Sequence, residues 1–266
     1  DHRDLHSFPT RRSSDLDTQN FVGSLTSLNV WPFLLGAVAL IFVFVQIEQN
    51  AEDPILNLRL FKSRQTALAS FLSAGAGLGE VGMVFIPSLA VAAMPTIINK
   101  HTASYLLMPV VLAMAVGSPL VGRLLDKFGS KAVVLAGTVL LSIGMLMLSN
   151  SNWTSVLWLF ITAATVIGFG LSSLLGTPVR YIMLNEASAA DRTSAQGLIA
   201  LFTSVGQLTS SALVGAVAAS MGGGVTGYGT AYLVIGVIAA IMVVLSLGLK
   251  SREQEVAHRA SVAAEA

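Results

Sequence analysis

Long apolar stretches alternate with short polar connections along almost the whole chain after residue 30. A membrane-spanning helix needs about 20 mostly apolar residues, and seven stretches approach or exceed that length: Trp31–Ile47, Thr66–Ala93, Thr102–Leu124, Ala132–Leu148, Ser155–Tyr181, Ser194–Ser220 and Ala231–Leu249. A large soluble helical bundle would need polar helix faces, which these stretches lack. The pattern therefore predicts an all-α integral membrane protein.

Composition supports this fold class and removes several kinds of chemistry. The chain is 54% hydrophobic and 11% charged, and its mean hydropathy is +0.75, outside the range of soluble domains. It contains no cysteine, which excludes disulfides and thiolate sites from the printed chain. Because no loop carries a Walker, HExxH or catalytic-triad pattern, we expect no enzyme, no cofactor and no metal. The expected surroundings are a lipid bilayer, without nucleic acid.

The positions of lysine and arginine predict the orientation in the membrane. One set of alternating connections and their flanks, including the C-terminal tail 250–266, holds Arg59, Lys62, Arg64, Arg123, Lys127, Lys131, Arg180, Arg192, Lys250, Arg252 and Arg259. The other set holds only Lys100. Basic residues favour the cytoplasmic side. We therefore expect the tail in the cytoplasm and residues 17–30 outside, in a multi-pass protein of the inner or plasma membrane.

Residues 1–16 differ from everything that follows. This polar, aperiodic segment (DHRDLHSFPTRRSSDL) resembles the in-frame translation of a sequencing adaptor, and the alternative is a basic N-terminal tail. No apolar segment follows its arginines directly, as a signal peptide would require. We interpret the segment as non-native, and we expect the natural protein to begin upstream.

The connection between the third and fourth stretches carries the most informative motif. It reads G-x-L-x-D-K-x-G-x-K and comprises Gly122, Arg123, Asp126, Lys127, Gly129 and Lys131. The motif resembles the cytoplasmic loop signature of the major facilitator superfamily of secondary transporters. Lys127 and Ser130 stand where that family usually has arginine, and lysine lacks the bidentate fork. The resemblance implies a loop that latches one conformation, more weakly here; the alternative is simple anchoring by positive charge.

Asp126 has two predicted partners in this loop. An aspartate favours the positive N-terminal end of a helix, here the helix that follows the loop. It also pairs readily with a nearby arginine. Both interpretations place Asp126 in a local structural role within the latch.

The resemblance also implies an architecture. Members of this superfamily have two six-helix bundles, and the fourteen-helix drug–proton antiporter branch inserts two further helices between them. Residues 54–61 (PILNLRLF) resemble the cytoplasmic connector of that branch. Residues 31–47 are then an inserted spanning helix, 48–65 an amphipathic connector with Ile55, Leu58 and Phe61 on one face, and 66–249 the C-terminal six-helix bundle. The partner implied for this bundle is the N-terminal bundle of the same protein.

Glu80 lies about midway along the second stretch. A lone carboxylate at the bilayer centre costs roughly 2.5–3.5 kcal/mol on insertion scales, so we expect Glu80 to face the bundle interior or water. There it would bind a proton or a cationic substrate; the alternative is a structural carboxylate bonded to a neighbouring helix. Gly75, Gly79 and Gly82 form an adjoining strip that permits close helix approach.

The sixth stretch carries two glutamines, Gln196 and Gln207, which are candidates for lining a cavity. Polar residues of this kind more often hold helices together than bind substrate, and we favour that interpretation. Thr193 with Gln196 also matches a capping box at the start of this helix. Gly206 stands where family members often have an arginine.

The resemblance implies transport by alternating access around a site near the midplane. The branch implies proton-coupled export of drug-like, amphipathic molecules. Uptake or exchange of an anion, sugar or siderophore is an alternative, and it predicts more basic residues facing the cavity. A membrane scaffold or sensor that does not transport is a further alternative.

Overall fold

The computed structural model describes residues 60–61, 63–99, 101–150, 155–188 and 191–257, with a few residues between 35 and 48. The main elements are α3 (Arg64–Val84), α4 (Ile86–Ala93), the 3₁₀-helix η2 (Ala103–Leu107), α5 (Met108–Phe128), α6 (Ser130–Ser149), α8 (Leu157–Leu175), α9 (Thr177–Glu186), α10 (Arg192–Ser220) and α11 (Gly224–Leu247). These residues contain no strand. Six of their helical segments are long and apolar enough to cross a membrane. The predicted all-α membrane fold is confirmed.

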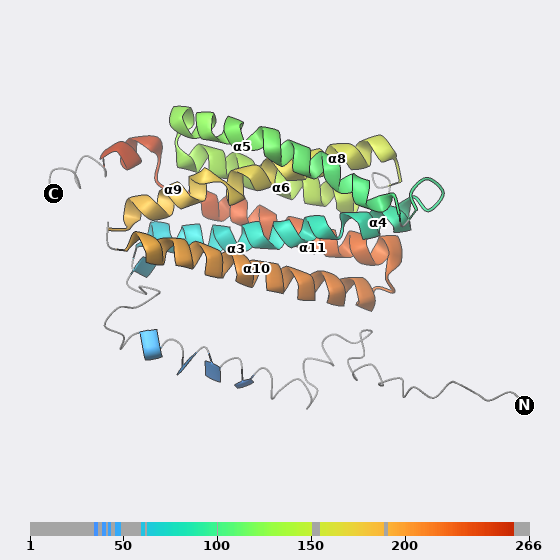
Figure 1. Cartoon of the computed structure of the whole chain (residues 1–266), viewed down its shortest axis with the longest axis horizontal. Helices are drawn as coiled ribbons and strands as arrows, with labels where there is room; N and C mark the ends of the chain where they lie inside the picture. Colours follow the sequence, from blue (N-terminus) through green and yellow to red (C-terminus); the bar gives the residue numbers. More distant parts are fainter. Residues whose placement is uncertain are drawn as a thin grey trace, which may run out of the picture.

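The helices lie side by side along one direction as a bundle (Figure 1). α3 packs most extensively against α10, α11 against α6, and α8 against both α6 and α5. α5 and α10 lie at opposite edges of the view, and they are the least buried of the long helices. The main core lies inside the bundle and includes Leu72, Phe160 and Tyr232.

The α3–α10 pair is held by direct contact between the two backbones. A methyl group on Gly206 would lie 1.8 Å from the carbonyl oxygen of Ala74, and one on Gly77 would lie 2.1 Å from that of Thr203. The Ser210 hydroxyl donates a hydrogen bond to a carbonyl oxygen of α3, that of Leu78, at 2.8 Å. Small residues and such polar contacts are the main means of helix association in membranes.

The predicted glycine strip on α3 packs on a different side of that helix. Gly75 faces Met242 of α11, and Gly79 faces Leu141 of α6, each too closely for an added methyl group. Beyond them, the carbonyl oxygen of Gly82 accepts a 2.8 Å hydrogen bond from the Tyr232 hydroxyl. The strip thus makes room for side chains of α11 and α6, whereas the backbone-to-backbone contact of α3 lies at Gly77.

Two predicted stretches are divided in the structure. The helix predicted at residues 66–93 breaks at Phe85, because Pro87 lies in the first turn of α4 and proline cannot continue a helix without losing a backbone hydrogen bond. The fifth stretch breaks at Gly176, and Pro178 again lies in the first turn of the next helix. α9 then continues to Glu186, beyond the predicted end at Tyr181.

Two predicted helix starts are also wrong. α11 begins at Gly224 rather than Ala231, because a glycine-rich segment that resembles a loop in sequence is packed as helix against its neighbours. α10 begins at Arg192 with Asp191 as its N-cap and has no side-chain cap. Thr193 therefore lies inside the helix, and the predicted capping box does not form.

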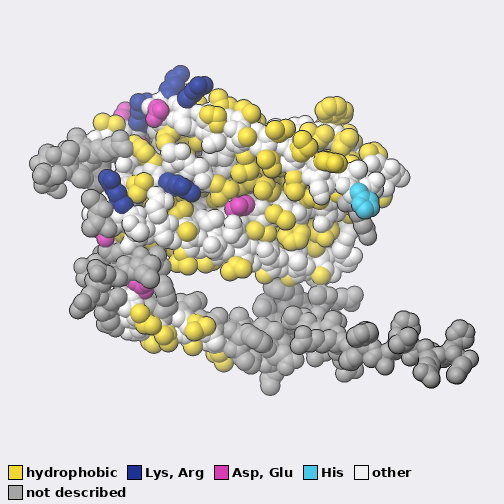
Figure 2. All heavy atoms as spheres, in the orientation of Figure 1, with side chains coloured by type: hydrophobic (Ala, Val, Ile, Leu, Met, Phe, Trp, Pro, Cys, Tyr) yellow, Lys and Arg dark blue, Asp and Glu magenta, His cyan; other side chains and the backbone are white. Residues whose placement is uncertain are grey.

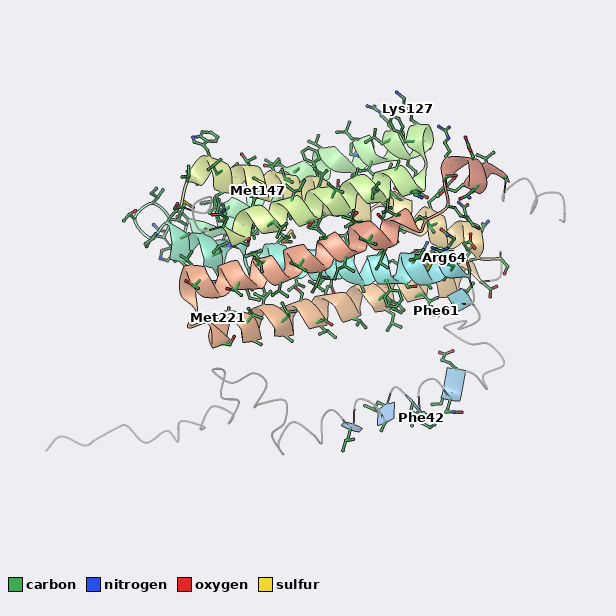
Figure 3. All side chains as sticks on the ribbon, turned by 180° about the vertical axis from the view of Figure 1, so that it is seen from behind. Phe42, Phe61, Arg64, Lys127, Met147 and Met221 are labelled. Carbon is green, nitrogen blue, oxygen red and sulfur yellow. The ribbon has the colours of Figure 1, made fainter. Side chains whose placement is uncertain are left out.

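Several predicted segments lie outside the described residues: 1–16 and 17–30, most of the predicted helix 31–47 and connector 48–65, and residues 258–266 of the predicted tail 250–266. Phe61, at the end of the predicted connector, is described, and its ring packs on Phe202 of α10 with 5.5 Å between centroids. Figure 3 shows Phe61 and Arg64 near the same end of the bundle as Lys127, with Met147 and Met221 at the other end.

Charge and hydrophobicity are separated on the surface. On the face in Figure 2, lysine and arginine side chains gather toward the end of the bundle where α9 finishes, and hydrophobic side chains cover much of the remainder. Large apolar side chains lie open on the flanks, including Trp158 at 77% and Leu208 at 72% exposure. Such extensive apolar exposure suits a surface in contact with lipid.

Candidate functional site

A cavity of about 440 Å³ lies between α3, α8, α9 and α10. Its lining is more polar than that of the two apolar cavities described below. The residues around it include Ser73 and Glu80 of α3, Gly176 and Arg180 at the α8–α9 junction, and Gln196, Thr203, Ser204 and Gln207 of α10. The cavity is therefore lined by the one acidic side chain of α3 and by four polar side chains of α10.

Glu80 is half-buried and has a defined partner. Its Oε2 accepts a 2.9 Å hydrogen bond from Nε2 of Gln207. A hydrogen bond to a carboxylate is stronger than one between neutral groups, so Gln207 both joins α10 to α3 and orients the acid. The structure thus places Glu80 beside a neighbouring helix and on the cavity wall at the same time.

Gln196 lies on the same cavity as Gln207, nearer the start of α10. α3 and α10 run in the same direction, since Ala74 lies opposite Gly206 and Leu78 opposite Ser210. The structure therefore brings Glu80, Gln196 and Gln207 together along one cavity. The sequence proposed each of them separately and did not predict their contact.

Arg180 also lines this cavity, and the sequence assigned it elsewhere. The sequence placed it among the basic residues of the connections and their flanks, but it lies within α9, because the helix continues to Glu186. Its side chain is exposed, and it shares the cavity with Glu80 without forming an ion pair with it. No local sequence signal marks this position, because the helix break at Gly176 decides where α9 points.

The predicted loop residues form a separate group at the end of the bundle. The side chains of Arg123, Asp126 and Lys127 are exposed, while the buried Gly129 adopts a φ of 83° before α6 begins. An L-residue would be strained in that conformation. Gly122 lies near the end of α5 with open space beside it.

The predicted partner of the α6 N-terminus is corrected by the structure. No acidic side chain lies in the first turn of α6, and Asp126 does not cap it. The carboxylate at this position belongs to Glu255, which is buried and accepts a hydrogen bond from the Ser130 hydroxyl. Asp126 precedes the turn at Gly129 and remains on the exposed side of the last turn of α5.

The loop is further tied to the C-terminal part of the chain. Arg252 donates a hydrogen bond to the backbone carbonyl of Lys127, and Nζ of Lys131 donates one to the carbonyl oxygen of Leu247 at 2.7 Å. The helical turn 252–257 therefore covers the α5–α6 loop. The predicted site residues fall into two groups, the cavity and the loop, and the structure does not bring these groups together.

Two further cavities in the described part of the chain have mainly apolar linings. One of about 690 Å³ lies between η2, α5 and α8, and one of about 370 Å³ lies between α5, α6 and α8, with Phe169 on both. The described residues contain no cluster of three or more His, Cys, Asp or Glu side chains that could hold a metal ion.

Comparison with known proteins decides the family. The family model described as Major Facilitator Superfamily matches residues 74–265, a range that covers most of the chain and includes the loop and all of the cavity-lining residues except Ser73. The chain belongs to the major facilitator superfamily. The loop motif at residues 122–131 is consistent with this membership.

Several transporters of this superfamily are similar to the chain. It is 27% identical over 200 residues to the MFS-type transporter YfiU of Bacillus subtilis, covering 73% of this chain and 37% of that protein. It is 25% identical over 206 residues to the multidrug resistance protein Stp of Mycobacterium tuberculosis, covering 73% and 35%. The quinolone resistance protein NorB of Staphylococcus aureus is 26% identical over 199 residues, covering 73% and 42%. The chain thus spans between about a third and a half of the length of these relatives.

Proposed function

We propose that the full-length protein exports drug-like, amphipathic small molecules across the cell membrane by alternating access, driven by the entry of protons. The observation that carries this proposal is the Glu80 carboxylate, which lies within a spanning helix and borders a cavity. An ionisable group at this depth marks a proton or substrate pathway more often than a structural site. The names of Stp and NorB support drug-like substrates.

The proposed cavity is completed by a partner bundle. α5 and α10 are the least buried spanning helices, and α10 forms one wall of the Glu80 cavity. An N-terminal bundle of the same protein, expected from the relatives' greater length, would cover the open side of this cavity. Rocking of one bundle against the other would then open the cavity to each side of the membrane in turn.

Glu80 and Gln207 suggest how a proton and a cationic substrate would exchange. When Glu80 is ionised, the Gln207 amide donates to it, and a lipophilic cation gains a counter-charge in the cavity. When a proton binds Glu80, that counter-charge disappears and the cation leaves. One proton is then carried inward for each cation released outward. The fourteen-helix drug–proton antiporter branch, supported by the connector-like residues 54–61, fits this exchange.

Arg180 favours a second candidate function. A guanidinium on the cavity wall would bind an anionic or zwitterionic solute, as the anion, sugar or siderophore alternative requires. In that case Arg180 rather than Glu80 binds the solute. Glu80 then binds only the proton whose movement drives solute transport.

The test uses the full-length protein in proteoliposomes with an imposed pH gradient. We expect Glu80→Gln to abolish proton-driven accumulation of a fluorescent lipophilic cation, because the amide cannot bind a proton. Exchange of the cation down its own gradient should also weaken, because the amide offers the cation no counter-charge, and the pH gradient should no longer affect the rate that remains. The control is Glu253→Gln, the same substitution at an exposed site outside the cavity. Unchanged proton-driven accumulation in Glu80→Gln would remove Glu80 from the mechanism.

The same vesicles separate the two candidate functions. If the solute is cationic, Arg180→Gln should leave its transport intact or increase it, because a positive charge is removed from the cavity. If organic anions are transported instead, Arg180→Gln should abolish that transport.

A further inference from the structure

A line of hydroxyl groups leads away from Glu80 along α3. Thr66, Ser70 and Ser73 follow one another at spacings of four and three residues, and Glu80 is two turns beyond Ser73. Residues at these spacings share one face of a helix. At a rise of 1.5 Å per residue, the line is about 21 Å long. It therefore joins the acid in the middle of the helix to the basic end of the bundle.

Two of these hydroxyls lack the partner that such groups normally have. Thr66 and Ser70 are 1% and 0% exposed, and neither hydroxyl oxygen makes a hydrogen bond with any residue that the structure describes. Serine and threonine in helices usually bond to the carbonyl one turn earlier, and Ser73 does so, to Ala69 at 2.9 Å. Buried polar groups are almost always satisfied by protein or by water. The two unpartnered hydroxyls thus mark places where water would bind.

The Glu80 cavity reaches the nearest hydroxyl of the line, that of Ser73. It is lined by both Ser73 and Glu80, so it bridges the longest gap in the line. The register that sets Ala74 opposite Gly206 also sets the first turns of α3 level with Gln196, which lines the same cavity. On α3 itself the cavity is lined from Glu80 to Ser73, and the unpartnered hydroxyls of Ser70 and Thr66 continue the line toward the start of the helix.

The line ends in a charged cluster at the surface of the bundle. Ser63, one turn before Thr66, donates a 2.6 Å hydrogen bond to Oε2 of Glu186. Oε1 of the same carboxylate is paired with Nζ of Lys250. Both charged side chains are partly exposed, so this cluster connects the line of hydroxyls to the water outside the bundle.

We propose that a water-filled path runs along α3 from Glu80 past Ser73, Ser70 and Thr66 to Glu186, and that it carries protons between Glu80 and the basic end of the bundle. Each transfer moves one proton along a hydrogen bond, so a proton that leaves the Glu80 carboxylic acid is matched by one released to water beside Glu186. Thr66 and Ser70 are positioning residues, because their hydroxyls hold the water molecules in line. The proton-carrying role rests on the proposed function, whereas the presence of water does not.

Hydration is tested with single cysteines in the full-length protein, after any cysteine outside the printed chain has been replaced; the printed chain itself has none. Thr66→Cys and Ser70→Cys are exposed to Ag⁺ in nitrate buffer, since this cation is small and reacts with thiols that meet water. Free thiols are then counted with a fluorescent maleimide after denaturation. The matched controls are Thr138→Cys and Ser246→Cys, at buried positions whose hydroxyls bond within their own helices.

We expect Ag⁺ to block the thiols of the Thr66→Cys and Ser70→Cys variants, while the thiols of both controls remain open to maleimide. Equal protection of all four thiols from Ag⁺ would mean that the line is dry and would overturn the proposal. This outcome does not depend on which solute is transported or on proton coupling.

Proton carriage is tested with Thr66→Val combined with Ser70→Ala, which removes both hydroxyls and leaves the shape of the side chains nearly unchanged. We expect proton movement coupled to transport in proteoliposomes to slow by about tenfold, the effect of losing roughly one hydrogen bond. Binding of a lipophilic cation should stay the same, as should proton movement in the Thr138→Val, Ser246→Ala control. An unchanged proton rate in the test variant would overturn the proton path. If the unmodified protein moved no protons at all, the proposed function would fail, and the Ag⁺ result would still decide whether the path holds water.

Discussion

Gly206 shows how strongly one residue can constrain a membrane helix pair. The family often has an arginine at this position, yet here even a methyl group would lie 1.8 Å from the Ala74 carbonyl oxygen. No larger side chain fits unless α10 moves away from α3. The hydrogen bonds from Gln207 to Glu80 and from Ser210 to Leu78 lie on the same pair of helices. The orientation of Glu80 therefore depends on Gly206, because this glycine lets α10 come close enough to α3 for Gln207 to reach Glu80.

We expect Gly206→Ala to lower the free energy of unfolding by about 1–3 kcal/mol, the usual cost of overpacking. Gly215 in the same helix is the matched control, because nothing lies within 4 Å of an added methyl group there. Gly215→Ala should be neutral or slightly stabilising, since alanine is the better helix former. Thermal unfolding in detergent measures both changes. Equal midpoints for the two variants would contradict close backbone contact between α3 and α10.

At the scale of elements, the helical turn 252–257 holds the α5–α6 loop. Glu255 is buried against Ser130, and Arg252 lies so close to Gly129 that an added methyl group there would be 2.9 Å from its Cβ. The loop that the sequence marked as a latch is thus supported by the chain's own C-terminal segment. This support leaves the side chains of Arg123, Asp126 and Lys127 exposed and open to other partners.

We expect Glu255→Gln to weaken this contact, because a hydrogen bond to a charged group contributes about 1.5–3 kcal/mol. Backbone amides of residues 129–131 should then exchange with deuterium faster, as measured by mass spectrometry. Glu253→Gln is the control, since that carboxylate is exposed in the same turn. A double-mutant cycle with Ser130→Ala isolates the pair, and a coupling energy near zero would show that the two residues do not interact.

At the scale of the whole molecule, the lysine and arginine side chains on the face shown in Figure 2 gather toward one end of the bundle, and hydrophobic side chains cover much of the rest of that face. The separation agrees with a molecule placed across a bilayer. The positive-inside rule further predicts that the basic end, with the start of α3 and the end of α11, faces the cytoplasm.

This orientation is tested by labelling intact cells that express the full-length protein with a single cysteine. Met221→Cys, at the exposed end of α10, should react with a membrane-impermeant maleimide. Glu253→Cys should react only after the cells are permeabilised. The reverse pattern would mean that the bundle is inserted with the basic end outside.

Residues 64–249 show how far sequence alone could predict the fold. The six described spans were recognised because the bilayer demands long apolar stretches, a requirement that acts on each segment independently. The breaks at Phe85 and Gly176 and the early start of α11 were missed, because prolines and glycines are tolerated in membrane helices wherever neighbouring helices satisfy the backbone. Those neighbours are distant in sequence.

The candidate site also has a part that the sequence predicted and a part that it did not. Glu80, Gln196 and Gln207 were recognised as polar groups in apolar surroundings, whereas Arg180 was misplaced and the Glu255–Ser130 contact was missed. The membrane class and the candidate polar residues thus follow from the sequence, since burial in lipid penalises each polar group one at a time. Which groups meet is decided only by the tertiary structure, because the helix register and the contact at Gly206 set the distances between them.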